Sequence, residues 1–496
     1  MPRTGARVHR SRFHPIARTG ALVIAAVLAG CTSLAPDYER PAVELPADWV
    51  AAGQSAGAAG MQWWNIYADA SLDRLVEEAL ANNADLQLAI ARVDEARAVL
   101  GQVRGEQFPV IDTRAERARS QLSERTDVPL PPGTPRESDS YRATLNISYE
   151  VDLWGRLRGA SAAARAELLA SEAAHQTVRT ALAAGVVQAY YGLRALDEQL
   201  AATQRSLAGR TEALALQRLR YQRGVISEFD YRQLEAETLA ARAQLPVLEL
   251  ARAQQEHALA VLLGKSPRAI YQDSVVAAAP ASDAAAPAPE PIVPAGLPSQ
   301  LLLRRPDLVE AEQRLIAANA RIGVARAAYF PSIALTGTLG SESNVLRDLF
   351  TGPAGVWRVA AAVTQPIWAG GRLSSQVEAA NARQRQALAQ YQAAIQNAFR
   401  EVRDAIVAQT KTRVQFEAES ERAAALRETL RLARLRYENG VASQLDVLDA
   451  ERNLLAAELN RSDALRAQRA AVADLFRALG GGWGADSPLA SAAAHK

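Results

Sequence analysis

The sequence contains a long internal repeat, and this feature limits the possible folds more than any other. Residues 219–241 (LRYQRGVISEFDYRQLEAETLAA) and residues 435–457 (LRYENGVASQLDVLDAERNLLAA) are identical at eleven of 23 positions without a gap. The same offset of 216 residues pairs Arg156 with Arg372, and an offset of 222 residues holds further upstream. A repeat of this length predicts one folding unit used twice, and therefore a pseudo-symmetric body instead of a single catalytic pocket.

The N-terminus predicts an exported lipoprotein. Five arginines precede an apolar run at residues 21–29, and small residues lead directly to Cys31. This pattern resembles the lipobox of bacterial lipoproteins, so we predict a signal peptide at residues 1–30 and acylation of Cys31 as the first residue of the mature chain. Thr32, where Asp is associated with inner-membrane retention, favours the outer membrane. The alternative is an ordinary signal peptide followed by an incidental cysteine.

The composition is typical of long helices, because the 496-residue chain is rich in Ala, Leu, Arg, Glu and Gln and has only 5% aromatic residues. Cys31 is its single cysteine, which excludes an internal disulfide and a cysteine-based metal site. Removing the five arginines of the signal from 56 basic residues leaves 51 against 54 acidic ones. We expect no nucleic-acid partner, because nearly balanced charge offers no basic stripe.

Two segments alternate between apolar and polar residues, as strands with one apolar face and one solvent-facing polar face do. They are residues 140–153 and their repeat counterpart 356–367, and each follows a weaker candidate strand, at 109–119 and 331–341. Their length suits tilted strands of an outer-membrane barrel, which need about 9–11 residues. The alternative is a pair of soluble hairpins that cap a helical bundle.

Four strands cannot close a barrel, and an open sheet edge in lipid leaves backbone groups without partners. If these strands lie in a membrane, the chain must therefore associate with further copies.

Two stretches predict helices too long for a compact domain. Residues 156–222 and 372–438 contain no proline, and 67 helical residues at a rise of 1.5 Å extend for about 100 Å. Apolar residues follow heptad-like spacing in the second stretch, which predicts antiparallel coiled-coil hairpins. A coiled coil with a purely structural role would show the same apolar heptad pattern, so this pattern alone does not identify a channel.

The predicted hairpin tips repeat most faithfully, as RGVIS and NGVAS. Glycine suits the left-handed turn that ends a helix, and serine suits the N-cap of the next one. Neither role requires the valine that follows each glycine, so these apolar positions indicate either a docking surface or simple packing within the turn. The docking hypothesis involves six residues: Gly224, Val225, Ser227, Gly440, Val441 and Ser443.

Three further motifs identify a family resemblance. The segments 149–158 (YEVDLWGRLR), 296–307 (GLPSQLLLRRPD) and 435–441 (LRYENGV) resemble the outer-membrane efflux channel lipoproteins of tripartite, resistance-nodulation-division type pumps, the TolC and OprM type. The similarity runs from Trp63 to Gly480. It implies a homotrimer with a 12-stranded β-barrel, four strands per chain, continued by a long α-helical barrel. A small equatorial region would hold the chain ends and the linker.

The resemblance also implies partners and a gate. The expected partners are a periplasmic adaptor, an inner-membrane pump and outer-membrane lipid. In this family, acidic side chains narrow the periplasmic entrance, and the segment LDVLDA at 445–450 matches it, so Asp446 and Asp449 become the gate candidates. They lie three residues apart on one helical face. Alternatively, Asp446 only caps its helix and Asp449 is a solvated surface charge. The first repeat has Asp230 and Gln233 at these positions.

We expect a passive exit duct for drugs or other small molecules, with no catalytic, cofactor-binding or metal site. The sequence contains neither a Walker-type GxxxxGK[ST] loop nor a GxSxG nucleophile elbow. The alternatives are a channel for type I protein secretion and a non-conducting coiled-coil lipoprotein. The predicted organisation is as follows: signal peptide 1–30, anchored segment 31–62, first repeat 63–270, Pro/Ala linker 271–300, second repeat 301–480 and tail 481–496.

Overall fold

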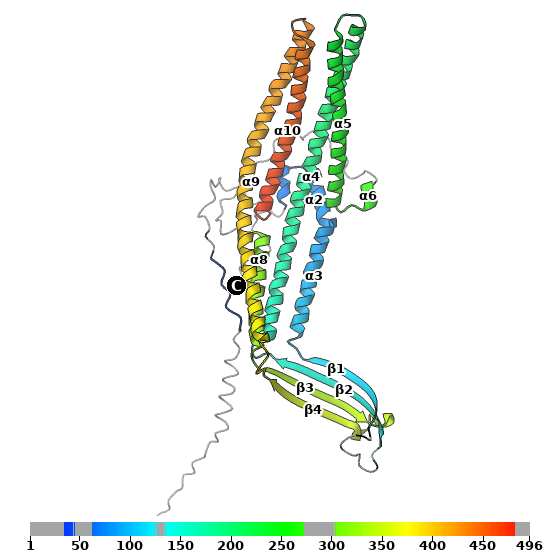
Figure 1. Cartoon of the computed structure of the whole chain (residues 1–496), viewed down its shortest axis with the longest axis vertical. Coiled ribbons are helices and arrows are strands. Elements are labelled where there is room, and N and C mark those ends of the chain that lie inside the picture. Colours follow the sequence, from blue (N-terminus) through cyan, green and yellow to red (C-terminus); the bar gives the residue numbers. More distant parts are fainter. Residues whose placement is uncertain are drawn as a thin grey trace, which may run out of the picture. The chain divides into compact units, whose positions relative to one another are not determined.

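The computed structural model describes residues 34–42, 44, 62–123, 125, 133, 135–271, 302 and 304–481, and it combines long helices with one sheet (Figure 1). The predicted signal peptide, Cys31, and nearly all of the linker and the tail lie outside the described residues. The chain divides into two compact units, and each draws on both halves of the sequence. Unit 1 is Met1–Pro41, Asp94–Ala170 and Glu312–Gln390; unit 2 is Ala42–Val93, Ser171–Ala311 and Tyr391–Lys496.

The sheet lies in unit 1 and has four antiparallel strands in the order β1-β2-β3-β4. The strands are β1 (Val110–Gln121), β2 (Glu137–Val151), β3 (Ser332–Ser343) and β4 (Gly355–Thr364). Two short 3-10 turns, η3 (Leu346–Asp348) and η4 (Gly352–Ala354), separate β3 from β4. All four predicted strands are therefore confirmed, including β1, whose charged sequence was the weakest signal.

Strand register gives the sheet one apolar face and one polar face. Leu145 of β2 lies opposite Leu339 of β3, which in turn lies opposite Trp357 of β4. Trp357 is 76% exposed, so the described residues do not cover this apolar face at Trp357. On the other face, Asn146 Nδ2 donates a hydrogen bond of 2.9 Å to Asp112 Oδ1 across β2 and β1. The predicted alternation is thus continued across neighbouring strands.

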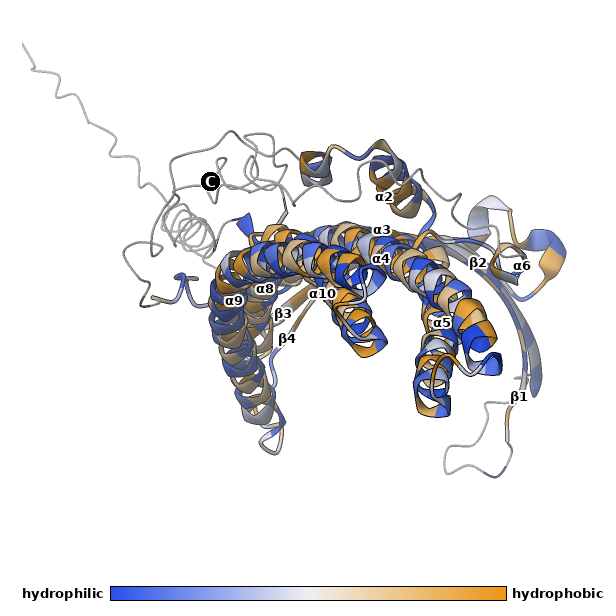
Figure 2. Ribbon diagram, turned by 90° about the horizontal axis from the view of Figure 1, so that it is seen from above, coloured by the Kyte–Doolittle hydropathy of each residue, from blue (hydrophilic) through white to orange (hydrophobic). Residues whose placement is uncertain are grey.

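Two helical hairpins repeat each other in length. Helix α4 (Arg156–Gln222) and helix α9 (Arg372–Glu438) each contain 67 residues, and their partners α5 (Glu228–Leu262) and α10 (Gln444–Ala478) each contain 35. The two long helices have the predicted bounds. Figure 2 shows hydrophilic and hydrophobic residues interleaved along these helices. Within the described ranges, every helix is too short or too polar to cross a bilayer.

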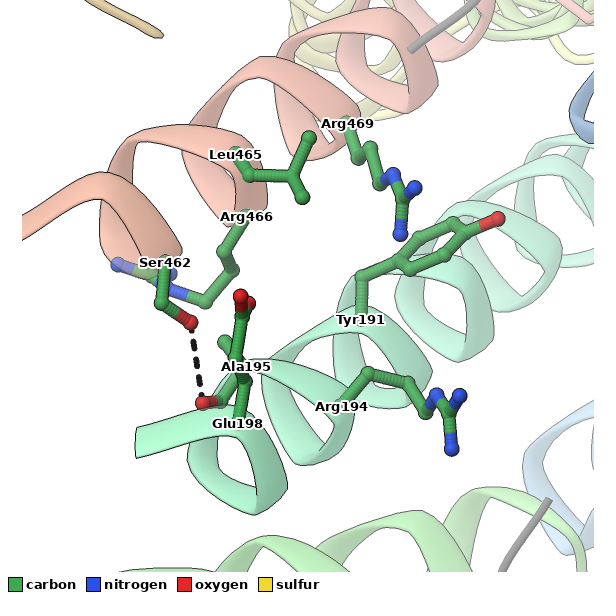
Figure 3. Close-up of a pocket in the computed structure, with 8 residues that line it drawn as sticks. All are labelled: Tyr191, Arg194, Ala195, Glu198, Ser462, Leu465, Arg466 and Arg469. Carbon is green, nitrogen blue, oxygen red and sulfur yellow. Dashed lines mark hydrogen bonds between the residues drawn. The ribbon is translucent and has the colours of Figure 1, made fainter. Parts of the chain in front are cut away.

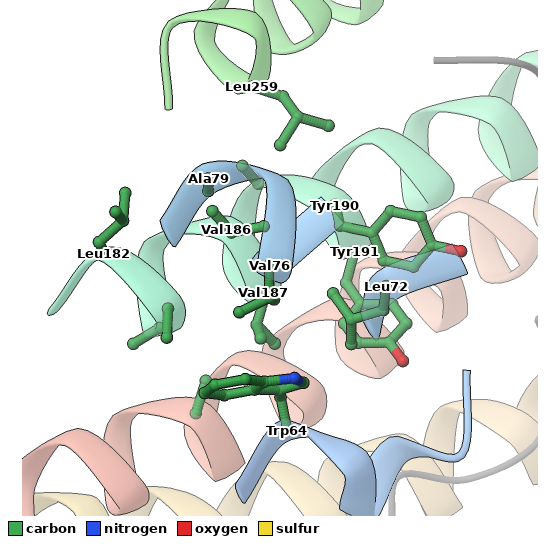
Figure 4. Close-up of a cluster of buried hydrophobic side chains, with 14 of the residues drawn as sticks. Trp64, Leu72, Val76, Ala79, Leu182, Val186, Val187, Tyr190, Tyr191 and Leu259 are labelled. Atoms are coloured by element: carbon green, nitrogen blue, oxygen red, sulfur yellow. The ribbon is translucent and has the colours of Figure 1, made fainter. Parts of the chain in front are cut away.

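The core of unit 2 lies where a short N-terminal segment packs on the hairpins. The other helical elements that the structure describes are η1 (Trp63–Tyr67), α2 (Ala70–Asn82), α3 (Ala84–Gly105), α6 (Pro267–Tyr271) and α8 (Pro306–Ala327). Trp63 stacks on Phe476 of α10 with ring centroids 4.8 Å apart. Figure 4 shows Trp64 and Leu72 beside Val187 of α4, all almost fully buried. This apolar packing is the main source of stability here.

Candidate functional site at the hairpin tips

The two hairpins end in the same turn, as their sequences predict. Gly224 and Gly440 adopt φ angles of +68° and +73°, the left-handed region that favours glycine. The N–H of Gly224 donates to the carbonyl of Tyr221, and the N–H of Val225 donates to that of Arg220, both at 2.9 Å. The corresponding bonds of the second tip are 3.0 and 2.9 Å long. Both turns are therefore Schellman motifs that satisfy the last helical carbonyls.

The serines and valines of the tips have separate roles. Ser227 Oγ accepts from the N–H of Asp230 at 3.2 Å, and Ser443 Oγ accepts from the N–H of Asp446 at 3.3 Å, so both serines are N-caps. Val225 and Val441 are 61% and 64% exposed, respectively. Because most of each valine surface meets no other part of the chain, turn formation does not account for these apolar residues.

The two gate candidates have different local bonds. Asp446 Oδ2 accepts from both the N–H and the hydroxyl of Ser443 at 2.8 Å, which completes a capping box. These two hydrogen bonds, the backbone bond foremost, hold the pKa of Asp446 below its usual range. Asp449 forms an ion pair of 2.9 Å with Arg452 and keeps half of its side chain exposed. Asp446 therefore caps its helix, which is the role that the alternative hypothesis to the gate gives it. Both carboxylates remain close to solvent.

A hydrogen-bond network near the tips joins the two hairpins and was not found from the sequence. The hydroxyl of Tyr437 on α9 accepts from Gln217 Nε2 at 2.7 Å and from Arg220 Nη1 at 2.8 Å, both on α4. Gln217 Nε2 also lies 3.1 Å from Gln444 Oε1 at the start of α10. The only sequence signal was the heptad spacing of Tyr437, which gave no indication of these polar partners.

Further along α4, a buried arginine connects all four hairpin helices. Arg210 is 3% exposed, and its Nη1 donates to the carbonyl and carboxylate oxygens of Glu237 on α5 at 2.8 and 3.2 Å. Its Nε lies 3.9 Å from Glu451 on α10, which pairs with Arg434 on α9 at 2.7 Å. A buried guanidinium needs such acidic partners; the hydrogen bonds of Arg210 to Glu237 stay within the first hairpin, and its contact with Glu451 reaches the second.

A small cavity lies between α4 and α10, between Tyr191 and Ser462 (Figure 3). Arg469 lies over the ring of Tyr191 at 4.4 Å, and Ser462 Oγ donates to the carbonyl of Ala195 at 3.1 Å. The volume of about 10 Å³ accommodates one water molecule at most, so this cavity is not a ligand site. Among the residues that the structure describes, no three His, Cys, Asp or Glu side chains are arranged to hold a metal ion.

Comparison with known proteins gives a consistent result over most of the chain. Residues 75–265 and 297–481 match the family described as Outer membrane efflux protein. The chain is 38% identical to outer membrane protein OprJ of Pseudomonas aeruginosa over 474 residues, covering 95% of this chain and 96% of that protein. It is 36% identical to the solvent efflux pump outer membrane protein SrpC of Pseudomonas putida, covering 92% and 96%.

The fold is also that of a solved channel. The crystal structure of the Campylobacter jejuni CmeC outer membrane channel superimposes with a TM-score of 0.86 at 26% identity, covering 93% of this chain and 98% of that one. The repeated hairpins, the four-stranded sheet and the matched residues therefore lead to one assignment: the chain belongs to the outer membrane efflux protein family.

Proposed function

We propose that this chain is the outer-membrane channel of a tripartite efflux system, a passive exit duct for drugs or other small molecules. It is a protein of the outer membrane that extends into the periplasm, as its family is. The observation that carries the proposal is the joining of two features in one chain: a sheet with an uncovered apolar face and paired helices of 67 residues. The sheet suits lipid, and the helices are long enough to extend well beyond a bilayer.

The channel forms as a homotrimer. Strands β1 and β4 are the two edges of the four-stranded sheet, and in lipid their unpaired backbone groups need partners. Pairing β4 of one copy with β1 of the next satisfies these groups, and three copies give a closed barrel of twelve strands. Each copy then contributes two hairpins to a helical barrel around the same axis.

The test is conductance together with oligomeric state. Purified full-length protein in detergent should migrate as a heat-modifiable trimer and should produce single-channel currents in planar bilayers. Expression in a strain that lacks its own efflux channel, together with a compatible adaptor and pump, should restore resistance to small toxic compounds. A monomer without conductance would instead indicate a non-conducting scaffold, and export of a protein substrate alone would indicate type I secretion.

Lipidation of Cys31 anchors the mature protein. The support is the sequence before it, because Cys31 lies outside the described residues. Labelled palmitate should be incorporated into the wild-type chain and absent from the Cys31→Ser variant. Incorporation into both proteins would show that the acyl group lies elsewhere.

The hairpin tips dock a periplasmic adaptor that connects the channel to an inner-membrane pump. The support is the exposure of Val225 and Val441 on turns whose geometry does not need them. Their neighbours Gly224 and Gly440 have no atom within 4 Å of an added Cβ, so the space around both turns is open. Ser227 and Ser443 complete the docking surface by holding each turn in shape.

Asp446 and Asp449 act as the periplasmic gate. Both carboxylates lie near solvent on the second hairpin, close to the tip. Threefold symmetry around the duct axis would bring six carboxylates together, and rings of that kind favour cations and set an aperture through mutual repulsion. The capping role of Asp446 fixes its position, which a gate residue needs.

A further inference from the structure

Residues 34–40 lie as a strap along α8 within unit 1, with a bend at Leu34 and Ala35. Asn319 Nδ2 donates to the carbonyl of Pro36 at 2.7 Å, and Arg326 Nη1 donates to the carbonyl of Leu34 at 3.1 Å. A Cβ added to Gly323 would lie 2.5 Å from the backbone nitrogen of Ala35, so the two backbones touch at this glycine. The strap therefore follows the helix in one direction, with lower residue numbers toward the C-terminal end of α8.

A buried carboxylate fixes the register of the strap. Glu312 is 6% exposed, and its two oxygens accept from Arg40 Nε and Nη2 at 2.7 and 2.8 Å. The hydroxyl of Tyr38 donates to the same carboxylate at 3.1 Å. Bidentate pairing of this kind permits only one alignment, because a strap shifted by one residue would leave a buried charge unpaired.

The last described contact of the strap, between Leu34 and Arg326, involves the residue before Ala327, which lines a cavity at the junction between helices and strands. From Glu312 to Arg326, α8 rises about 21 Å, and the six residues from Arg40 to Leu34 span about 20 Å, so strap and helix advance together. Three residues span at most about 10 Å, and this is the greatest distance that can separate Cys31 from Leu34. The cavity has a volume of about 320 Å³, and Ala327, Ala328 and Phe330 belong to its lining.

Apolar residues line most of the cavity, and the one cation among its described lining residues, Arg156, is paired with a carboxylate. Trp154 stacks on Phe330 with centroids 4.6 Å apart, and its Nε1 donates to the carbonyl of Pro331 at 2.8 Å. The charged lining residues are Glu150, Asp152 and Arg156, and Arg156 donates two hydrogen bonds to Glu150. A phospholipid headgroup needs an available cation for its phosphate, whereas an acyl group without phosphate does not.

We propose that this cavity binds an acyl chain of the lipid on Cys31, delivered there by the strap. The inference rests on the proposed lipidation of Cys31. Three observations support it: the fixed register at Glu312, the short length of chain between Leu34 and Cys31, and a mainly apolar cavity whose two carboxylates disfavour phosphate. The volume lies within the range of about 300–1,000 Å³ that is usual for small-molecule sites. Bound in this way, the lipid stabilises the junction and holds the channel at one depth in the membrane.

The test uses the full chain, labelled in cells with a palmitic acid analogue that carries a photoreactive group. After irradiation, mass spectrometry should identify crosslinks in the peptides that contain Trp154 and Phe330. The Ala328→Phe variant, which fills the cavity, should lower this crosslinked fraction about tenfold, because the acyl chain loses its apolar contacts. The Gly323→Ala variant, which forces the strap off α8, should lower it about threefold. Gly101→Ala on α3 is the matched control, since no atom lies within 4 Å of the added carbon.

The possible outcomes separate this inference from the lipidation on which it rests. Absence of label from the wild-type protein would overturn both. Label that is present but crosslinked only to bulk lipid, to the outer face of the sheet or to a neighbouring copy would overturn the cavity alone. The same peptides labelled by a photoreactive phospholipid in the Cys31→Ser variant would show that free lipid fills the cavity, which also overturns the proposal. Trimer formation and conductance, measured for each variant, identify any that misfold.

Discussion

The two helical hairpins of this chain have equal lengths and the same turn, but they differ in the side chains around that turn. In the first, Tyr221 stacks on Tyr231 of its own hairpin, with centroids 5.3 Å apart. In the second, Tyr437, the repeat counterpart of Tyr221, hydrogen-bonds to the other hairpin. A full capping box with an acidic residue is present at Asp446 of the second tip.

This difference teaches which parts of a repeat are constrained. The glycine and serine positions determine the backbone turn, so both copies retain them. Positions whose side chains make contacts specific to one hairpin, such as Tyr221 and Tyr437, are free to diverge once the chain carries two copies. We therefore expect substitutions at shared positions to act alike in both hairpins, and substitutions at divergent positions to act in one.

The largest effect should come from charging both tips. Val225→Asp combined with Val441→Asp places a carboxylate at each proposed contact, and burying an unpaired charge in an interface costs several kcal/mol. Crosslinking to the adaptor should fall more than about 100-fold, while the trimer stays intact on a native gel. Each single variant should weaken crosslinking less than the pair does. Normal crosslinking by the double variant would exclude the tips as the docking surface.

Removal of Arg210 should have the next largest effect, because this residue joins the hairpins. Arg210→Ala leaves Glu237 without its partner, but Glu451 keeps Arg434, so the expected loss is about 2 kcal/mol, less than for a fully buried pair. Arg434→Ala is the matched control; its side chain is 53% exposed, and it should cost less than about 1 kcal/mol. Denaturant unfolding followed by the helical circular-dichroism signal measures both. Equal losses would mean that Arg210 does not connect the hairpins.

The contacts of Arg210 also show which features of the fold cannot be predicted from the sequence. The absence of proline predicted the long helices, and the glycine and serine positions of the tips predicted both turns. These features are local properties of the chain. Alternation predicted the strands; it was weak in β1, where Arg117 and Arg119 lie on the same face as Leu145 and Arg117 pairs with Asp139 of β2. The contacts of Arg210 and Tyr437 could not be predicted, since periodicity places a residue on a helical face without giving the rotation of one hairpin against another.

The structure also limits what was predicted for the gate. Sequence spacing placed Asp446 and Asp449 on one face, and the structure adds that Ser443 holds the first while Arg452 pairs with the second. Neither observation depends on a second copy of the chain. The gate therefore remains a prediction about the assembled channel.

Replacing both gate candidates should change conductance severalfold. Asp446→Ala with Asp449→Ala removes six carboxylates from a trimer, so the entrance should widen, lose cation preference and show conductance raised about threefold. The matched control is Asp230→Ala with Gln233→Ala at the same repeat positions of the first hairpin, which should leave conductance unchanged. Identical, fully open currents from the wild type and both variants would exclude Asp446 and Asp449 as the gate.

The smallest effect should be the pH dependence of the second capping box. Hydrogen bonds from Ser443 lower the pKa of Asp446 from its ordinary value of 3.8, so the carboxylate stabilises the folded tip above that value. This stabilisation is lost as the pH falls through the lower pKa of the folded state. The Tm difference between the wild type and Asp446→Asn should therefore be present near pH 6 and should vanish well below about pH 3. A difference that stays constant over this range would mean that the charge of Asp446 does not contribute to the cap.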